Sequence, residues 1–393
     1  MKYNILIKYI NSIPSATEEN KIDTARIQLL CEKLGRVNVG GGYIYLSGGE
    51  YAHGSGMILE SILKSSGYSV ARITDAYGFD IKRSIYLDGT SPSIEEFTNI
   101  LTYIRDILKK HKDTSFLREE VVFAFCLYVS KILGVKYVIL ENTCERTRSM
   151  FEICNPYNFA IIPKLYGDVD DSQLSRVSSC IDKVNRGVVT GNNHLYNYFS
   201  GCCHKAGIRL SIHRSVDIIE EKMRQQTFVY NKREYVLKSS SAVLRDCAIS
   251  VIELIDMMKN HGAKISPAAI CDGIKNVGNC GCLEVVSLSP MIICDNSSNV
   301  GQLELLCEKL SEYYKKSNLD GVVVCFENPD EAIGKAFSKL ENVSYIDSID
   351  VSVNELAEKI LDKQNMSKLT VILGGLEFCE NVKSVVKSRM DKF

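Results

Sequence analysis

Short runs of β-forming apolar residues alternate with helical segments along the chain, and this alternation limits the fold more than any other feature. The first run, Tyr43–Ser47, is followed by glycines and then by apolar residues at helical spacing over 57–66. Strands that alternate with helices are typical of a parallel sheet covered by helices on both faces. Further strands are predicted at 68–74, 136–141 and 159–163, and further helices at 94–110, 121–133 and 242–261.

A glycine-rich segment at 273–282 interrupts this rhythm, which restarts after it. We therefore predict two domains, residues 1–279 and residues 280–393. Before the boundary, a short β-element is expected at 233–237, and the charged run 220–222 is expected to be the exposed face of a helix. After the boundary, strands are predicted at 283–288, 291–295, 321–326, 343–347 and 369–375, and helices at 303–316, from 331 onward and at 353–363.

The expected fold class is therefore α/β, with a large P-loop-like domain around a mainly parallel sheet and a smaller, Rossmann-like C-terminal domain. The charge is balanced, with 47 Lys and Arg against 48 Asp and Glu and a formal net charge of −1. This balance excludes a strongly basic nucleic-acid-binding protein and an acidic disordered tail.

The chain also lacks the marks of a membrane or secreted protein. Its apolar runs fall short of the roughly 20 residues that cross a bilayer, and the N-terminal segment does not have the pattern of a secretory signal. The 15 cysteines have no regular spacing, which fits a reducing compartment better than a disulfide framework. We expect a cytoplasmic protein with neither a membrane nor a nucleic-acid partner.

The segment 44–55 (IYLSGGEYAHGS) has the composition of a strand-to-helix turn that could hold phosphate. In such a turn, glycines let backbone N–H groups approach the phosphate oxygens, a lysine reaches the terminal phosphates, and a Ser or Thr hydroxyl binds Mg²⁺. The glycines and Ser55 are present, but His53 stands where the lysine is expected, and histidine is shorter and mostly neutral at pH 7. On these residues alone, a glycine-rich turn without nucleotide is an equally good interpretation.

The order of these segments resembles folylpolyglutamate synthase and dihydrofolate synthase of the Mur ligase superfamily over nearly the whole chain. The G-T-N-G-K-G-S loop of that family falls on Gly49–Ser55 (GEYAHGS). Other family motifs fall on 66–70 (SGYSV), 74–89, 118–125 (REEVVFAF), 139–152, the junction 280–284 (CGCLE) and the loop 295–300 (DNSSNV).

The resemblance implies ATP and Mg²⁺ as cofactors and a Mur-ligase-type fold. It also implies which positions would contact them. The loop lysine, the junction arginine and the histidine of the 295–300 loop are replaced, and the metal-ligating histidine expected near Asp168 is missing. Residues that shape the fold agree with the family, whereas residues that carry its chemistry mostly differ. The nucleotide contacts would be Gly49, His53, Gly54, Ser55, Asp295 and Asn299, and the metal ligands Ser55, Glu119 and Glu141.

Three functions remain open at this point. The favoured one is a folylpolyglutamate synthase-like protein that by descent is an ATP-dependent acid–amino-acid (glutamate) ligase, but is now weakly active or inactive, a pseudoenzyme. The second is an active amide ligase for folate or another acyl substrate with altered metal geometry. The third is a non-catalytic binding or scaffold protein that uses the interdomain cleft. The expected partner is a folate-like or other carboxylate small molecule, or a partner enzyme.

Overall fold

The computed structural model describes residues 2–77, 80–90, 93–111, 114–167, 169–278, 280–297, 299–317, 319–327 and 331–391, which form two compact units. Unit 1 consists of Met1–Pro163, Ser172–His213 and Ser250–Ile274. Unit 2 consists of Lys164–Asp171, Arg214–Ile249 and Lys275–Phe393. Two segments of unit 2 thus precede the boundary placed at 279/280, and that boundary stays a prediction.

Unit 1 is built on a seven-stranded sheet with the strand order β3-β2-β4-β1-β5-β6-β7. All neighbouring strands are parallel except β2 and β3, which are antiparallel. Strand β1 lies at the centre of this sheet, and all but its last residue are buried there. In chain order the strands are β1 (Tyr43–Ser47), β2 (Val70–Thr74), β3 (Ile85–Leu87), β4 (Tyr137–Asn142), β5 (Tyr157–Ile162), β6 (Val184–Thr190) and β7 (Arg209–Ile212).

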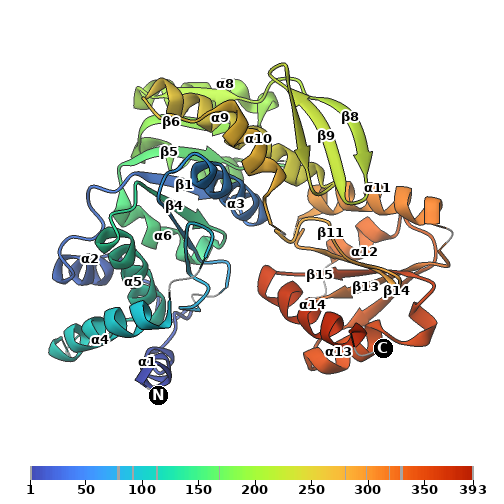
Figure 1. Ribbon diagram of the computed structural model, residues 1–393, viewed down its shortest axis with the longest axis horizontal. Helices are drawn as coiled ribbons and strands as arrows, with labels where there is room; N and C mark the ends of the chain where they lie inside the picture. Colours follow the sequence, from blue (N-terminus) through green and yellow to red (C-terminus); the bar gives the residue numbers. More distant parts are fainter. Residues whose placement is uncertain are drawn as a thin grey trace. The chain divides into compact units, whose positions relative to one another are not determined.

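Helices cover both faces of this sheet. Tyr43 and Tyr45 of β1 belong to a core shared with helices α1, α2, α4 and α5. Figure 1 shows helices α2, α4 and α5 grouped on one side of the sheet. Helix α3 packs against β1, β2 and β4. Up to residue 275 the helices are α1 (Lys2–Asn11), α2 (Thr24–Lys33), α3 (Glu50–Ser65), α4 (Ile94–Lys110), α5 (Arg118–Ile132), α6 (Arg148–Phe151), α7 (Asp171–Ser178), α8 (Tyr196–Ala206), α9 (Ala242–Asn260) and α10 (Pro267–Lys275), with 3₁₀ turns η1 (Glu145–Thr147), η2 (Glu152–Cys154), η3 (Ile181–Lys183) and η4 (Asn193–Leu195).

Unit 2 contains two further sheets. One has three antiparallel strands in the order β10-β9-β8, and the other has five strands in the order β11-β12-β15-β13-β14, parallel except for the β11–β12 pair. Its strands are β8 (Asp217–Lys222), β9 (Gln225–Tyr230), β10 (Arg233–Leu237), β11 (Glu284–Leu288), β12 (Met291–Asp295), β13 (Val322–Phe326), β14 (Val343–Asp347) and β15 (Leu369–Leu373). Its helices are α11 (Val300–Ser317), α12 (Glu331–Phe337), α13 (Val353–Ile360) and α14 (Leu376–Met390), with the 3₁₀ turn η5 (Lys363–Asn365).

The expected α/β class with mainly parallel sheets is confirmed, with two local corrections. The charged run 220–222, expected on a helix, belongs to the strand β8, which pairs with β9 and lies at the edge of its sheet. Charged residues are common on such edges because they discourage pairing with other chains. The helix expected over 57–66 begins much earlier, at Glu50. Among the described residues, no helix combines the length and the apolar character needed to span a membrane.

Candidate functional site

The turn between β1 and α3 is the place where the sequence suggests a phosphate-binding loop. Gly48 and Gly49 turn the chain there with φ angles of +104° and +56°. The N–H of Tyr51 then donates to the Gly48 carbonyl at 3.0 Å, and the N–H groups of Ala52 and His53 donate to the Gly49 carbonyl at 3.1 and 3.2 Å. These amides are therefore used within the first turn of α3, whereas a phosphate-binding loop leaves such groups free for oxygen atoms of the ligand.

The early start of α3 also places Gly54 and Ser55 inside a helix rather than in a loop. Ser55 is fully buried, and its hydroxyl has no hydrogen-bond partner among the described residues. Tyr51 is 1% exposed, and its hydroxyl lies 2.7 Å from Ser250 Oγ. The sequence held a signal for this helix start, because the apolar residues Tyr51, Ala52, Ile58 and Leu59 continue the helical spacing toward the N-terminus.

A buried network of four charged or polar side chains lies beside α3. His53 and Glu60 come from α3, Arg72 from β2 and Glu141 from β4, and each is 5% exposed or less. Arg72 donates from Nε to Glu60 Oε2 at 2.7 Å and from Nη1 to Glu141 Oε2 at 2.9 Å. His53 Nδ1 lies 2.9 Å from Glu141 Oε1. The two carboxylates thus have positively charged or polar partners within the protein, as buried carboxylates require.

The electrostatics of this network favour ionised groups. Burial raises the pKa of the Glu141 carboxyl, but His53 and Arg72 more than offset it, so that the pKa lies below its ordinary value. Burial by itself lowers the pKa of the Arg72 guanidinium, yet Glu141 and Glu60 reverse this and raise the pKa. Glu141 is therefore a carboxylate whose charge is already compensated by side chains of this chain.

The ligands expected for magnesium differ in how far groups of this chain engage them. Glu141 Oε2 accepts from Arg72 and Glu119 Oε2 accepts the N–H of Ala16 at 3.0 Å. Glu141 Oε1, 2.9 Å from His53 Nδ1, and the Ser55 hydroxyl are buried without a hydrogen-bond partner among the described residues. Within the described part of the chain, no three His, Cys, Asp or Glu side chains gather as metal ligands. Magnesium prefers free carboxylate oxygens and water. The assignment of Ser55, Glu119 and Glu141 as metal ligands stays a prediction, and Asp168, near which another ligand was expected, lies outside the described residues.

Asp75 holds together the loop that follows β4, a role the sequence did not reveal. Its Oδ1 accepts the N–H and hydroxyl of Thr143 at 2.6 and 2.7 Å, and its Oδ2 accepts from Asn142 Nδ2 at 2.9 Å, from the Cys144 N–H at 3.2 Å and from the Thr147 hydroxyl. Burial raises the pKa of Asp75, although these donors act in the opposite direction. The number of donors indicates a structural carboxyl.

A second buried chain of polar groups links α3 to α9. His213 Nε2 lies 2.6 Å from Ser250 Oγ, which is also the neighbour of the Tyr51 hydroxyl. A histidine beside a serine can be a catalytic pair. Here the serine side chain is completely buried, so no substrate reaches it, and the chain of contacts serves to fix α3 against α9.

In unit 2, the two residues expected to face nucleotide take part in local hydrogen bonds. Asp295 Oδ2 accepts the Leu283 N–H at 2.7 Å, and its Oδ1 accepts the Ser297 N–H at 2.8 Å. Asn299 Oδ1 accepts the Gln302 N–H at 3.0 Å, at the start of α11. Burial raises the pKa of Asp295, and the Ser297 and Leu283 contacts lower it. The role of both residues in nucleotide binding stays a prediction.

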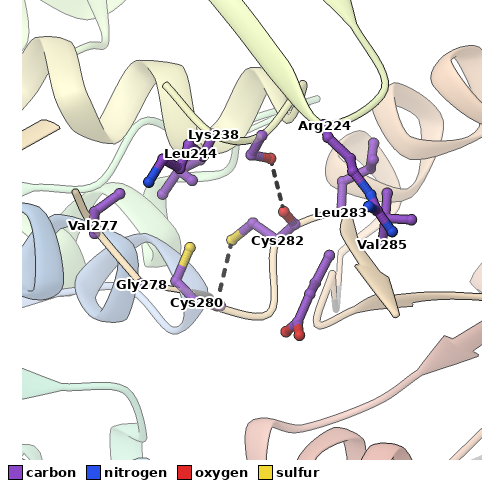
Figure 2. Close-up of a pocket in the computed structure, with 11 residues that line it drawn as sticks. Arg224, Lys238, Leu244, Val277, Gly278, Cys280, Cys282, Leu283 and Val285 are labelled. Carbon is purple, nitrogen blue, oxygen red and sulfur yellow. Dashed lines mark hydrogen bonds between the residues drawn. The ribbon is translucent and has the colours of Figure 1, made fainter. Parts of the chain in front are cut away.

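A pocket of about 270 Å³ lies beside the junction segment of unit 2 (Figure 2). Its lining includes Arg224, Lys238, Cys280 and Cys282, and the figure shows Cys282 between the two basic side chains in this view. The Cys282 carbonyl accepts the Ser239 hydroxyl at 3.1 Å. The neighbouring Cys280 thiol and burial raise the pKa of Cys282, which keeps it a neutral thiol.

The fold was compared with proteins of known sequence and structure. No family model and no curated protein matches the sequence. Solved structures do match. A folylpolyglutamate synthase–AMPPCP–folate complex gives a TM-score of 0.80 at 16% identity and covers 98% of this chain and 100% of that chain. The chain has the folylpolyglutamate synthase fold.

Further folylpolyglutamate synthase structures give the same result. The apo enzyme from L. casei matches with a TM-score of 0.77 at 16% identity, covering 99% of this chain and 100% of that chain. The Thermotoga maritima enzyme gives 0.73 at 17% identity and covers 98% of this chain and 97% of that one. The Mycobacterium tuberculosis enzyme, complexed with ADP and AMPPCP, gives 0.73 at 13% identity with 98% of both chains covered. The resemblance seen in the sequence is thus confirmed for the fold.

Proposed function

We propose that this protein is a non-catalytic form of the folylpolyglutamate synthase fold, a pseudoenzyme that binds a small carboxylate without ligating it. The observation that carries the proposal is the helix start at Glu50, because it consumes the Tyr51, Ala52 and His53 amides in intrahelical hydrogen bonds. A polyphosphate that bound at this turn, as at the family's loop, would have to break these hydrogen bonds to reach the amides.

The charges around this turn support the same conclusion. By the family resemblance, ATP would phosphorylate a carboxylate and the amine of glutamate would attack the acyl phosphate. That reaction needs fixed positive charge around the moving phosphoryl group. His53 provides no such charge to a ligand, since its ring faces Glu141, and Ser55 is buried. Losing one stabilising group of this kind costs about 10²–10³ in rate, so several losses leave little activity.

A second candidate is an active amide ligase with altered metal geometry. It is supported by the high TM-score to a complex that contains AMPPCP and folate, since a fold that similar could bind the same classes of ligand. A scaffold role toward a partner enzyme is the remaining variant of the non-catalytic proposal.

Calorimetric titration and thermal shift with Mg·ATP distinguish these candidates. A ligand at about 100 times its Kd stabilises the folded state by about 2.7 kcal/mol, which a melting curve detects. ADP release is measured in parallel with glutamate and with folate or dihydropteroate as acceptor. No nucleotide binding and no ADP release, together with binding of folate alone, support the proposal. Mg-dependent binding with turnover refutes it and establishes the ligase.

His53→Lys tests the loop itself. If the helix start blocks phosphate, the added lysine leaves ATP affinity unchanged, because the amides of the first turn remain engaged. The matched control is His204→Lys, which adds the same charge at an exposed position of α8. A gain in affinity for His53→Lys alone would show that the turn can still open for phosphate, and the proposal would fail.

A further inference from the structure

A second candidate site lies at the opposite edge of the unit 1 sheet from the turn that precedes α3. In a parallel sheet, the ends of neighbouring strands meet at a common edge. Here the residues just before or at the starts of β1, β2, β4, β5 and β6 line a groove of about 690 Å³, together with the loop after α9. This volume suits a small molecule, whose binding sites usually measure about 300–1,000 Å³.

The charge of this groove has one sign. Lys136, Arg186 and Lys264 line it, and none of its lining residues that the structure describes is acidic. All three cations are exposed, and no ion pair joins them to a carboxylate within the described residues. Cations inside proteins and in grooves are usually paired with nearby carboxylates, and a concave surface with one sign of charge concentrates the opposite ions.

The walls that carry these cations are held by specific contacts. The Tyr68 hydroxyl accepts the Lys264 N–H at 2.7 Å, and its ring packs edge-on against Tyr137 with ring centroids 5.2 Å apart. The Arg186 guanidinium lies 6.0 Å from the centre of the Phe159 ring, and His261 packs against the same ring at 5.5 Å.

Backbone contacts fix the floor of the groove in the same way. A side chain at Gly42 would come within 2.4 Å of the Lys136 carbonyl, so the two loops touch through their backbones. Gly262, with a φ of +91°, lets the chain turn after α9 and present Lys264. Lys136 and Lys264 are therefore displayed from loops, and Arg186 from strand β6, that these contacts hold in place without a ligand.

We propose that this groove binds a small multivalent anion, a molecule with two or more phosphate or carboxylate groups, against Lys136, Arg186 and Lys264. The two tyrosine rings give such a ligand an apolar wall, and the cations give it charge-assisted hydrogen bonds. The groove lies before β1, whereas the family's nucleotide loop lies after β1, so the two sites are separate. The proposal holds whether or not the chain is catalytic.

Titration calorimetry of the full chain in metal-free buffer tests this site with two probes. Inorganic triphosphate represents the phosphate source, and an N-acetylated triglutamate peptide represents the polycarboxylate source. Binding of either probe, weakened between about 50 and 300 mM NaCl, is the expected result. Preference for one probe identifies the source. Failure of both to bind at about 5 mM in low salt overturns the proposal.

Substitutions locate the binding. Each of Lys136→Gln, Arg186→Gln and Lys264→Gln is expected to weaken binding about 2- to 5-fold, and the triple variant about 20-fold. The control is the triple variant Lys33→Gln, Lys109→Gln and Lys205→Gln, which removes the same charge from exposed positions outside the groove. It should bind as the unmodified chain does. Equal weakening in both triple variants would show a general charge effect and refute the site. Melting curves confirm that both variants remain folded.

Discussion

Replacing Arg72 by methionine removes a guanidinium while keeping a long side chain in its place. The residue is 3% exposed and bridges Glu60 and Glu141 at 2.7 and 2.9 Å. Its guanidinium also lies 4.3 Å from the centre of the Tyr86 ring. In the Arg72→Met variant, two buried carboxylates from different elements lose their shared cation.

The expected loss in the free energy of unfolding is large, because removing one partner of a buried ion pair leaves an uncompensated charge. Such changes destabilise proteins by about 3–5 kcal/mol. Loss of the contact with Tyr86 adds roughly 0.5–2 kcal/mol. Changing both carboxylates to amides as well, with Glu60→Gln and Glu141→Gln in the same chain, removes the uncompensated charges. This triple variant is expected to recover at least half of the loss.

The loss of stability in Arg72→Met should depend on pH in one direction. The pKa of Glu141 lies below its ordinary value of 4.5 in the folded chain, so its stabilising contribution is present above that value and is lost as the pH falls through the folded-state pKa. Without Arg72, the carboxyl binds a proton more readily. The penalty of the substitution should therefore be smaller at pH 5 than at pH 7.

Urea unfolding followed by circular dichroism at both pH values measures these effects. The matched control is Arg105→Met, which removes a partly exposed arginine paired with Asp106 at 2.9 Å and should cost about 0–1 kcal/mol. A loss for Arg72→Met no larger than that of the control, or one that does not change with pH, would refute the interpretation of the network as a charge-compensating core.

Four further substitutions test packing and hydrogen bonds within unit 1. Gly273→Ala should lower the free energy of unfolding in urea by about 1–3 kcal/mol, because the new Cβ would lie 2.6 Å from Ile62 Cα. Gly201→Ala is the matched control: it has open space around it in α8 and should raise the free energy of unfolding by up to about 1 kcal/mol. Ser250→Ala should cost about 1 kcal/mol through loss of the contacts with Tyr51 and His213, and no change in melting temperature would contradict that role. Asp75→Asn turns an amide toward backbone and hydroxyl donors and should cost about 1–3 kcal/mol, with faster hydrogen exchange at Thr143 as the local readout.

Elements with strong local signals were predicted well from the sequence. Strands β12 and β14 have the predicted bounds, as does helix α4, whose first turn is fixed by a capping box between Ser93 and Glu96. Strand β8 was mistaken for a helical face because three charged residues in a row suit any exposed element. Only pairing with β9 decides that it is a strand.

The candidate site was harder to predict, since its geometry depends on contacts between distant residues. Sequence motifs placed Gly49–Ser55 in a phosphate-binding loop, but the helix starts at Glu50 with Tyr51 held against Ser250, a residue from a different element. The partners of Arg72 also come from α3 and β4. No local pattern reveals such pairings, and only the replaced family residues, His53 among them, pointed to a changed site.

These contacts are consistent with our proposal that the fold persists while the chemistry of its relatives does not carry over. A carboxylate on β4, such as Glu141, is fully buried and needs positive partners whether or not a metal is present. Arg72 supplies a positive charge from within the chain at 2.9 Å from Glu141 Oε2, and the His53 ring lies beside Oε1. Because the sheet is stabilised by burial of strands such as β1 and β4, its core does not depend on whether a metal or a side chain compensates Glu141. If the chain is non-catalytic, as we propose, the pairing of Glu141 with Arg72 serves the stability of the fold rather than metal binding.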